Sequence, residues 1–177
     1  NKVLKAMNRQ HTREEYIKLA ENFFQIIPDC SISHDMISGF PNESEKDHND
    51  TLSLMEKVKY SFGYMFKYSE RPGTLAAKKL EDNIDEETKS RRLSEIVELQ
   101  QKHSLYRSKE FVGKTVEVLI EKESKKSNLH WAGRNQQNTT VVFPKENYKI
   151  GDFVNVKINS CTSATLMGEA IDFSKNN

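Results

Sequence analysis

The stretch from Asp35 to Glu43 constrains the fold more than any other part of the chain. The apolar residues between Ile32 and Ile37 form a run too short for a helix, which is typical of a buried strand. Proline at 41 bars continuation of that strand, and Gly39, which has no Cβ, lets the backbone come close to a ligand. The stretch therefore predicts a strand end beside a ligand, with a plain connecting loop as the alternative.

Helical patterns lie on both sides of this strand. Thr12 and Glu15 form a capping box that opens a helix stopped by Pro28, and Ser44 and Asp47 form a second capping box. Helical spacing gives each segment an apolar face: Tyr16, Leu19, Ala20, Phe23, Phe24 and Ile27 in the first, and Thr51, Leu52, Leu54, Met55 and Val58 in the second.

An aromatic run from Phe62 to Tyr68 is typical of a second strand. Because each strand follows a helix, we expect a parallel sheet with right-handed crossovers. The carboxyl ends of parallel strands meet at one edge, where α/β proteins bind ligands. A Pro-Gly turn over Ser69–Thr74 ends the second strand, so the candidate ligand edge consists of Gly39, Pro41, Arg71 and Gly73.

After a polar connector, Leu75–Asn83, we expect a long helix from about Asp85 to Arg107. Its apolar face would be Leu93, Ile96, Val97 and Leu105, and its basic residues, Lys89, Arg91, Arg92 and Lys102, are interpreted as an ordinary solvated face.

From Phe111 onward the pattern changes to short strands at Lys114–Ile120, Thr139–Phe143, Val154–Ile158 and Thr165–Ile171. Turn signals at Ala132-Gly133 and at Ile150-Gly151-Asp152 favour a small antiparallel barrel of OB-like size.

The predicted organisation is thus α/β followed by all-β: an α/β part over residues 1–84, a connecting helix over 85–109, a β-barrel over 110–173 and a tail over 174–177.

The net charge of +1 over 177 residues gives the chain no overall electrostatic attraction for nucleic acid, so any such contact needs local basic patches. No apolar run approaches the roughly 20 residues that span a bilayer. Cys30 and Cys161 lie far apart, which fits a reducing, cytoplasmic setting, and neither alone makes a metal site.

No motif for a nucleophile, a zinc site or a nucleotide loop is present, and Asp35 is a candidate catalytic residue whose alternative role is to bind local backbone. The five histidines are scattered and are interpreted as surface or structural residues.

In the barrel, aromatic residues and arginine could stack on bases, and basic residues could bind phosphate. The stacking candidates are Trp131, Arg134, Phe143 and Tyr148, and the phosphate candidates are Lys114, Lys125, Lys126 and Arg134. Alternation around Phe143 favours a core position for it, which leaves Trp131 and Arg134, followed by polar residues 135–138, as the better candidates.

Several segments together resemble the radical S-adenosylmethionine methylthiotransferases of the MiaB family. In the first part they are Met7-Asn8-Arg9 leading into Thr12–Tyr16, Asp35-Met36-Ile37 with Gly39–Ser44, and Tyr68–Thr74. The part from Phe111 looks like the family's TRAM domain, with Gly133-Arg134, Asn138, Val141–Pro144, Gly151-Asp152 and Leu166-x-Gly168-Glu169. Each motif alone is weak, but four in the right order are fairly specific.

The resemblance implies the C-terminal half of a TIM-like radical-SAM (β/α) partial barrel followed by a TRAM barrel. It implies S-adenosylmethionine and two 4Fe-4S clusters as cofactors of the full-length enzyme. The C-x-x-x-C-x-x-C motif for one cluster and three further cysteines for the other do not occur in this sequence. The chain, which also begins without methionine, is therefore expected to be a C-terminal fragment that is inactive alone.

The implied reaction is methylthiolation of an isopentenylated adenosine next to the anticodon of tRNA, by an enzyme that is monomeric when full length. Its partner would be the tRNA anticodon stem-loop, and no membrane is involved. The alternatives are an RNA-binding module without catalysis of its own, and the branch that methylthiolates an aspartate of a ribosomal protein. Gly133-Arg134, Asn138 and Val142-Phe143 favour the tRNA-modifying branch, within the resemblance.

The resemblance also implies residue roles. Arg9 would hold the carboxylate of S-adenosylmethionine, Ile37 and Gly39 would line its adenine, and Arg71 would lie at the pocket rim. Asp35 is a further candidate at this site, where binding of local backbone is the alternative role. RNA contacts would fall on Lys114, Trp131, Arg134 and Asn138. The chain departs from the family pattern with Asn42 for glycine, Ser44 for threonine and Glu70 for proline.

Overall fold

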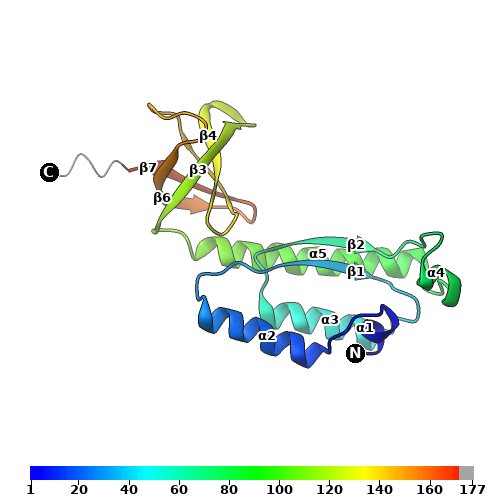
Figure 1. Cartoon of the computed structure of the whole chain (residues 1–177). Coiled ribbons are helices and arrows are strands. Elements are labelled where there is room, and N and C mark those ends of the chain that lie inside the picture. The colour runs from blue at the N-terminus through cyan, green and yellow to red at the C-terminus, as the bar shows by residue number, and fades with distance from the viewer. Residues whose placement is uncertain (172–177) are drawn as a thin grey trace. The chain divides into compact units, whose positions relative to one another are not determined.

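Two units with different secondary structure make up the computed structural model, which describes residues 1–171 (Figure 1). The first unit, Asn1–His103, combines helices with a small sheet, and the second begins at Ser104 and is built mainly of strands. This confirms the expected order of α/β followed by all-β. The predicted tail over 174–177 lies outside the described residues.

A parallel two-stranded sheet forms the centre of the first unit. Strand β1, Ser33–Ser38, pairs in parallel with β2, Phe62–Lys67, and helix α3, Glu45–Val58, connects them. The register runs in step from Ser33 opposite Phe62 to Ser38 opposite Lys67. One further hydrogen bond, from Tyr68 N to Ser38 O at 2.8 Å, continues the pairing beyond β2. The predicted parallel arrangement is confirmed, and both strands end at the same edge.

Helices α2, Arg13–Ile26, and α3 begin where their capping residues predict. Helix α1 spans Lys2–Ala6. Thr12 caps α2 and Ser44 caps α3, and in both the third helical residue returns a hydrogen bond to the cap, which completes the capping box. Burial opposes ionisation of Asp47, but hydrogen bonds from Ser44 and Lys2 outweigh it and lower the pKa of Asp47 to about 2.

The core of the first unit packs on one face of the sheet. It consists of Ala20 from α2, Met55 and Val58 from α3, Tyr60, and Ile96 from the following long helix, with Met36 and Met65 of the sheet against them. The apolar face predicted for α2 is only partly correct. Leu19 and Phe23 are about half exposed, whereas Ile17 and Ala20 are buried, because the helix turns the side next to α3 toward the core.

Two expectations for the following segment are wrong. The predicted polar connector contains a short helix, α4, Leu75–Lys79, which is capped by Thr74. The long helix is present as α5, Glu86–Lys109, but its most buried stripe shares only Ile96 with the predicted apolar face. That stripe consists of Lys89, Arg92, Ile96, Gln100 and His103, all at most 5% exposed, so Lys89 and Arg92 do not belong to a solvated face.

This polar stripe is buried because partners on other elements satisfy it. Gln100 donates its amide to Tyr60 O at 2.9 Å, and its Oε1 lies 2.9 Å from Nε2 of buried His34. The pairing places a proton on Nε2 of His34, and its Nδ1 is buried without a partner among the described residues. Burial lowers the pKa of His34 below its ordinary value, and His103 acts in the same direction, while Gln100 and Asp35 oppose the shift.

Acid should therefore destabilise the first unit through His34. Because the folded state lowers this pKa, its contribution to stability is complete above the unfolded value of about 6.5 and is lost as the pH falls below it. His34→Gln keeps an amide donor toward Gln100 but does not titrate. We expect the free energy of unfolding, measured with urea and far-UV circular dichroism, to fall more between pH 7.5 and pH 5 in the parent chain than in the variant. Equal losses in both would contradict this assignment.

The second unit contains a closed five-stranded barrel with the strand order β3-β4-β5-β7-β6. Its strands are β3 Thr115–Ser124, β4 Ser127–Asn135, β5 Thr140–Pro144, β6 Phe153–Cys161 and β7 Thr165–Ala170. Four of the five pairings are antiparallel, but β5 and β7 pair in parallel, so the expectation of a wholly antiparallel barrel is wrong. Among the described residues, no helix is long and apolar enough to cross a membrane.

Strand β4 was not predicted, because Ala132-Gly133 suggested a turn. Both residues lie within the strand, and Gly133 is opposite Ile120 and Val141 on its two neighbours. A Cβ at Gly133 would overlap the carbonyl oxygen of Leu119, so glycine is required here by close backbone approach. Inside the barrel, apolar side chains from the strands form one core: Val118, Ile120, Val141, Phe143, Val154, Val156, Ile158 and Leu166.

Candidate functional site

The turn from Gly39 to Glu43 lies at the carboxyl end of β1. The amide of Gly39 donates to both carboxylate oxygens of Glu43 at 3.2 Å, and the amide of Glu43 donates to Phe40 O at 2.9 Å. Gly39 and Asn42 both have positive φ, +72° and +62°. Asparagine, the residue type at position 42, tolerates this conformation best after glycine. The Glu43 side chain thus joins the two ends of the turn.

Glycine at position 39 makes room for a side chain of the protein itself. A Cβ built there would overlap Cγ of Lys89, which reaches across from α5. The Lys89 ammonium lies 2.6 Å from Asp82 and 3.0 Å from Glu86, and 5.7 Å from the centre of the Tyr68 ring. Packing against Lys89 is therefore a reason for glycine at position 39 that the sequence did not reveal.

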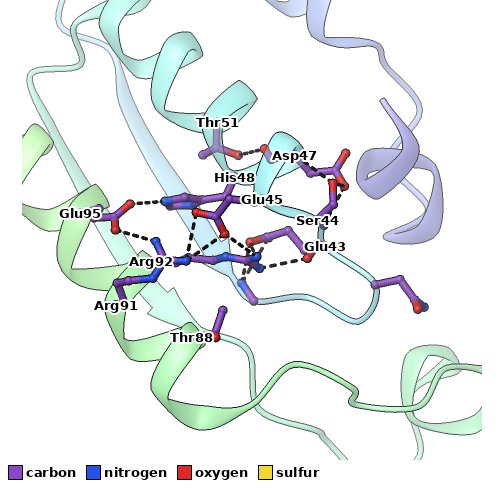
Figure 2. A network of polar contacts seen from close by, with 12 residues as sticks. Glu43, Ser44, Glu45, Asp47, His48, Thr51, Thr88, Arg91, Arg92 and Glu95 are labelled. Carbon is purple, nitrogen blue, oxygen red and sulfur yellow. Dashed lines mark hydrogen bonds and ion pairs between the residues drawn. The ribbon is translucent and has the colours of Figure 1, made fainter.

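Arg92 of α5 binds the same turn at its other end (Figure 2). Its Nη1 donates to the carbonyl oxygen and to Oε1 of Glu43, both at 3.0 Å, and its Nη2 donates to Glu45 at 3.0 Å. The side chains of Arg92 and Glu43 are each 5% exposed. This is a buried ion pair in which each charge has further hydrogen bonds, the condition for such a pair to be tolerated.

A more exposed layer surrounds this pair (Figure 2). Arg91 binds Glu45 at 2.9 Å and Glu95 at 2.7 Å, and buried His48 lies 2.7 Å from Glu95 through Nε2. Hydrogen bonds from Arg91 and then Arg92 lower the pKa of Glu45 to about 2. Since these carboxylates are largely open to solvent, the layer adds less to stability than the buried pair.

The other face of the sheet carries exposed side chains. Asp35 and Ile37 of β1 lie opposite Tyr64 and Phe66 of β2, and all four are exposed. The predicted site residues Asp35 and Ile37 therefore share a face with two aromatic residues that sequence reasoning did not single out. Alternation within Phe62–Lys67 is the signal that could have found Tyr64 and Phe66.

The two arginines predicted for the cofactor follow elements at this end of the sheet. Arg9 lies in the exposed loop after α1, and Arg71 lies in the exposed turn between β2 and α4. Figure 1 shows α1 and α4 at the end of the sheet where both strands terminate. Lys2 of α1 binds Asp47 at the start of α3 at 3.2 Å, which fixes α1 at that end. Of the five predicted residues, Asp35 and Ile37 thus share one exposed face of the sheet, Gly39 follows the end of β1, and Arg9 and Arg71 lie in exposed loops after α1 and β2.

In the barrel, two of the four predicted RNA-contacting residues are bonded to each other. Arg134 donates to the backbone oxygen and to Oδ1 of Asn138 at 3.1 and 2.8 Å, and its Nε lies 3.4 Å from Glu121. Asn138 has φ +62° in the turn between β4 and β5. Lys114 is exposed just before β3, where its backbone is hydrogen-bonded to Phe111 and Ile158.

The aromatic candidates differ in accessibility. Phe143 is fully buried in the barrel core, as alternation around it predicted, and Tyr148 is partly buried against that core. Trp131 is partly buried, and the ammonium of Lys145 lies 4.4 Å from its ring centre, which covers one face of the ring. Lys125 and Lys126 are exposed at the tip between β3 and β4.

The chain's own residues do not supply the ligands of an iron-sulfur cluster. Cys30 lies in the first unit and Cys161 in the second, and both are free thiols. Among residues 1–171, no three side chains of the metal-ligating types come together.

Comparison with known proteins identifies relatives over the whole chain. The TRAM domain family matches residues 109–171. The tRNA-2-methylthio-N(6)-dimethylallyladenosine synthase of Christiangramia forsetii is 68% identical over 177 residues, which are 100% of this chain and 37% of that protein. The protein of the same name from Flavobacterium johnsoniae is 67% identical over the same shares, and that of Bacteroides fragilis is 50% identical over 97% of this chain and 37% of its own length.

The chain spans 37% of the length of these curated relatives, and the match falls on their C-terminal part. The likeness extends through both units, because the aligned region includes the sheet as well as the barrel. The chain therefore belongs to the family of the tRNA-2-methylthio-N(6)-dimethylallyladenosine synthases, the MiaB-type methylthiotransferases, and corresponds to their C-terminal part with its TRAM domain.

Proposed function

We propose that the chain is the C-terminal part of a tRNA methylthiotransferase that acts on isopentenylated adenosine next to the anticodon. The single observation that carries this proposal is the identity of 68% over the whole chain to a synthase named for that product. In this proposal, residues 1–84 are the last β/α units of a radical-SAM partial barrel, 85–109 connect, and 110–173 are the TRAM barrel. The enzyme is cytoplasmic and monomeric in the same proposal.

The parallel sheet supports a nucleoside site at its carboxyl edge. We assign the carboxylate of S-adenosylmethionine to Arg9, its adenine to Ile37 beside Gly39, and the rim to Arg71, with Asp35 on the same exposed face. Bound there and reduced by a cluster, the cofactor would supply a deoxyadenosyl radical, which is needed because no side-chain base can remove a ring C–H proton. The residues of this chain would bind and orient that cofactor.

The test uses the full-length protein that carries this chain, reconstituted with its clusters. Incubation with S-adenosylmethionine, a reductant, a sulfur source and tRNA bearing isopentenyladenosine should yield the methylthio nucleoside, detected by mass spectrometry after digestion. Ribosomal protein offered in place of tRNA should remain unmodified. Modification of the protein, or an unmodified tRNA under conditions in which S-adenosylmethionine is cleaved, would contradict the proposal.

The barrel would bind the anticodon stem-loop partly through Arg134, which the turn at Asn138 holds in place. Arg134→Met should weaken binding of the stem-loop and lower the slope of log K against log salt by about one, as expected for one lost phosphate contact. Fluorescence anisotropy of labelled RNA at several salt concentrations measures this slope. Lys18→Met, which removes an exposed positive charge from α2, is the control and should leave the slope unchanged.

A further inference from the structure

Helix α5 grips the turn after β1 at two points. Lys89 fills the space beside Gly39, and Arg92, one turn further along the helix, binds the carboxylate and the carbonyl oxygen of Glu43. Gly39 and Glu43 are the two ends of this turn, and the Glu43 carboxylate also accepts the Gly39 amide. The orientation of the Gly39 peptide thus depends on Glu43, and the position of Glu43 depends on Arg92.

The energetic character of this contact indicates a role other than stability. Removing two charges from water costs several kcal/mol each, so a buried ion pair is often no more stabilising than apolar residues of similar size. Arg92 also keeps its Nε buried without a partner among the described residues, which is a further cost. The pair instead fixes the orientation of the turn. The planar guanidinium holds three acceptors, Glu43 O, Glu43 Oε1 and Glu45 Oε2, in one geometry.

The turn continues directly from the exposed face of β1. Ile37 is 44% exposed on that face, two residues before Gly39, and Ser38 between them is buried and pairs with β2. A change in the orientation of the Gly39 peptide would therefore alter the position of Ile37 on this face. We propose that Arg92, acting through Glu43, is a positioning residue that holds the Gly39–Glu43 turn in the shape that receives S-adenosylmethionine.

This inference rests on the proposed function, and its test measures binding instead of turnover. The full-length enzyme carrying this chain, loaded with clusters and kept without reductant, is titrated with S-adenosylmethionine in a calorimeter well below its unfolding temperature. Arg92→Lys keeps the charge, but one ammonium cannot hold three acceptors in the geometry of a guanidinium. We expect the Kd to rise about tenfold or more, the range in which losing a supporting residue commonly falls.

Arg91→Lys is the matched control. Arg91 is the neighbouring arginine and also binds Glu45, but it does not contact Glu43, so its replacement should leave the Kd within about twofold. Glu43→Gln is the second test variant, because it keeps the size of the side chain and removes the charge that Arg92 holds. It should raise the Kd like Arg92→Lys. A purely structural role would lower the unfolding temperature of both test variants and leave the Kd unchanged.

The outcomes separate the two proposals. If the parent enzyme binds and both Arg92→Lys and Glu43→Gln bind equally well, the positioning role is overturned and the proposed function stands. An equal loss of affinity in Arg91→Lys would also overturn it, since the effect would then belong to the charged layer as a whole. If the parent enzyme itself does not bind S-adenosylmethionine, the proposed function and the positioning role are overturned together.

Discussion

Replacing Arg92 by methionine should lower the free energy of unfolding of the first unit by about 3–5 kcal/mol, the loss measured when one partner of a buried ion pair is removed. Methionine fills most of the space, but it leaves the carboxylate of Glu43, 5% exposed, without a countercharge. It also removes the hydrogen bond to Glu43 O and the bond to Glu45. A loss of this size is a large part of the stability of a domain.

Urea unfolding followed by far-UV circular dichroism measures this loss, because the helices lie mainly in the first unit. Trp131, the one tryptophan of the chain, lies in the barrel, so its fluorescence follows the second unit and should keep its midpoint. Arg91→Met is the control: its salt bridges are exposed, and the loss should stay within about 1 kcal/mol. Similar losses for both arginines would show that burial of the Glu43 pair is unimportant.

Replacing Phe143 by alanine should destabilise the barrel by about 3–5 kcal/mol, the usual cost of deleting a buried aromatic ring. Phe143 is fully buried and lies opposite Trp131 across β4 and β5. A barrel of about 60 residues has a small core and little stability to spare, so we expect the variant to be largely unfolded in this unit at moderate temperature. The tryptophan emission should shift to the red as its surroundings open.

Phe153→Ala provides the comparison within the same barrel. Phe153 lies on β6 and is 68% exposed, so its replacement should change the free energy of unfolding by no more than about 0.5 kcal/mol. Thermal unfolding monitored by tryptophan fluorescence distinguishes the two variants. If Phe143→Ala were as stable as Phe153→Ala, the ring at position 143 would not be a core residue, and its earlier interpretation as a possible base-stacking residue would return.

Local signals in the sequence predicted the parts of the fold that local chemistry determines. Thr12 with Glu15 and Ser44 with Asp47 defined two helix starts, and the alternation of helices with apolar strands predicted the parallel pairing of β1 and β2. These features depend on residues a few positions apart. The edge of the sheet that carries the candidate site followed from the same reasoning.

Features that depend on distant partners were not predictable in this way. Lys89 and Arg92 are typical surface residues by composition, and their burial depends on Asp82, Gly39 and Glu43 approaching in space. Hydrophobic periodicity cannot detect a helix face whose burial relies on paired charges. The sequence thus marked Gly39 as special but did not reveal that Lys89 packs beside it.

Barrel connectivity was missed for a related reason. The pairing of β3 with β4 shifts register at two places, so the side chains of β4 do not alternate cleanly, and Gly133 resembles a turn residue until its approach to Leu119 is known. The parallel pairing of β5 with β7 joins segments separated by the whole of β6. Only the residues facing the core, such as Val141 and Val156, follow a pattern that can be read along the chain.

The closed order of the five strands has a consequence for how the second unit responds to stress. Each strand is hydrogen-bonded to a neighbour on both sides, so the barrel has no unpaired edge strand. An edge strand could open before the others or pair with a strand of another molecule. We therefore expect the amide protons of these strands to exchange together, in a single cooperative opening, and we expect the barrel to resist aggregation until it opens.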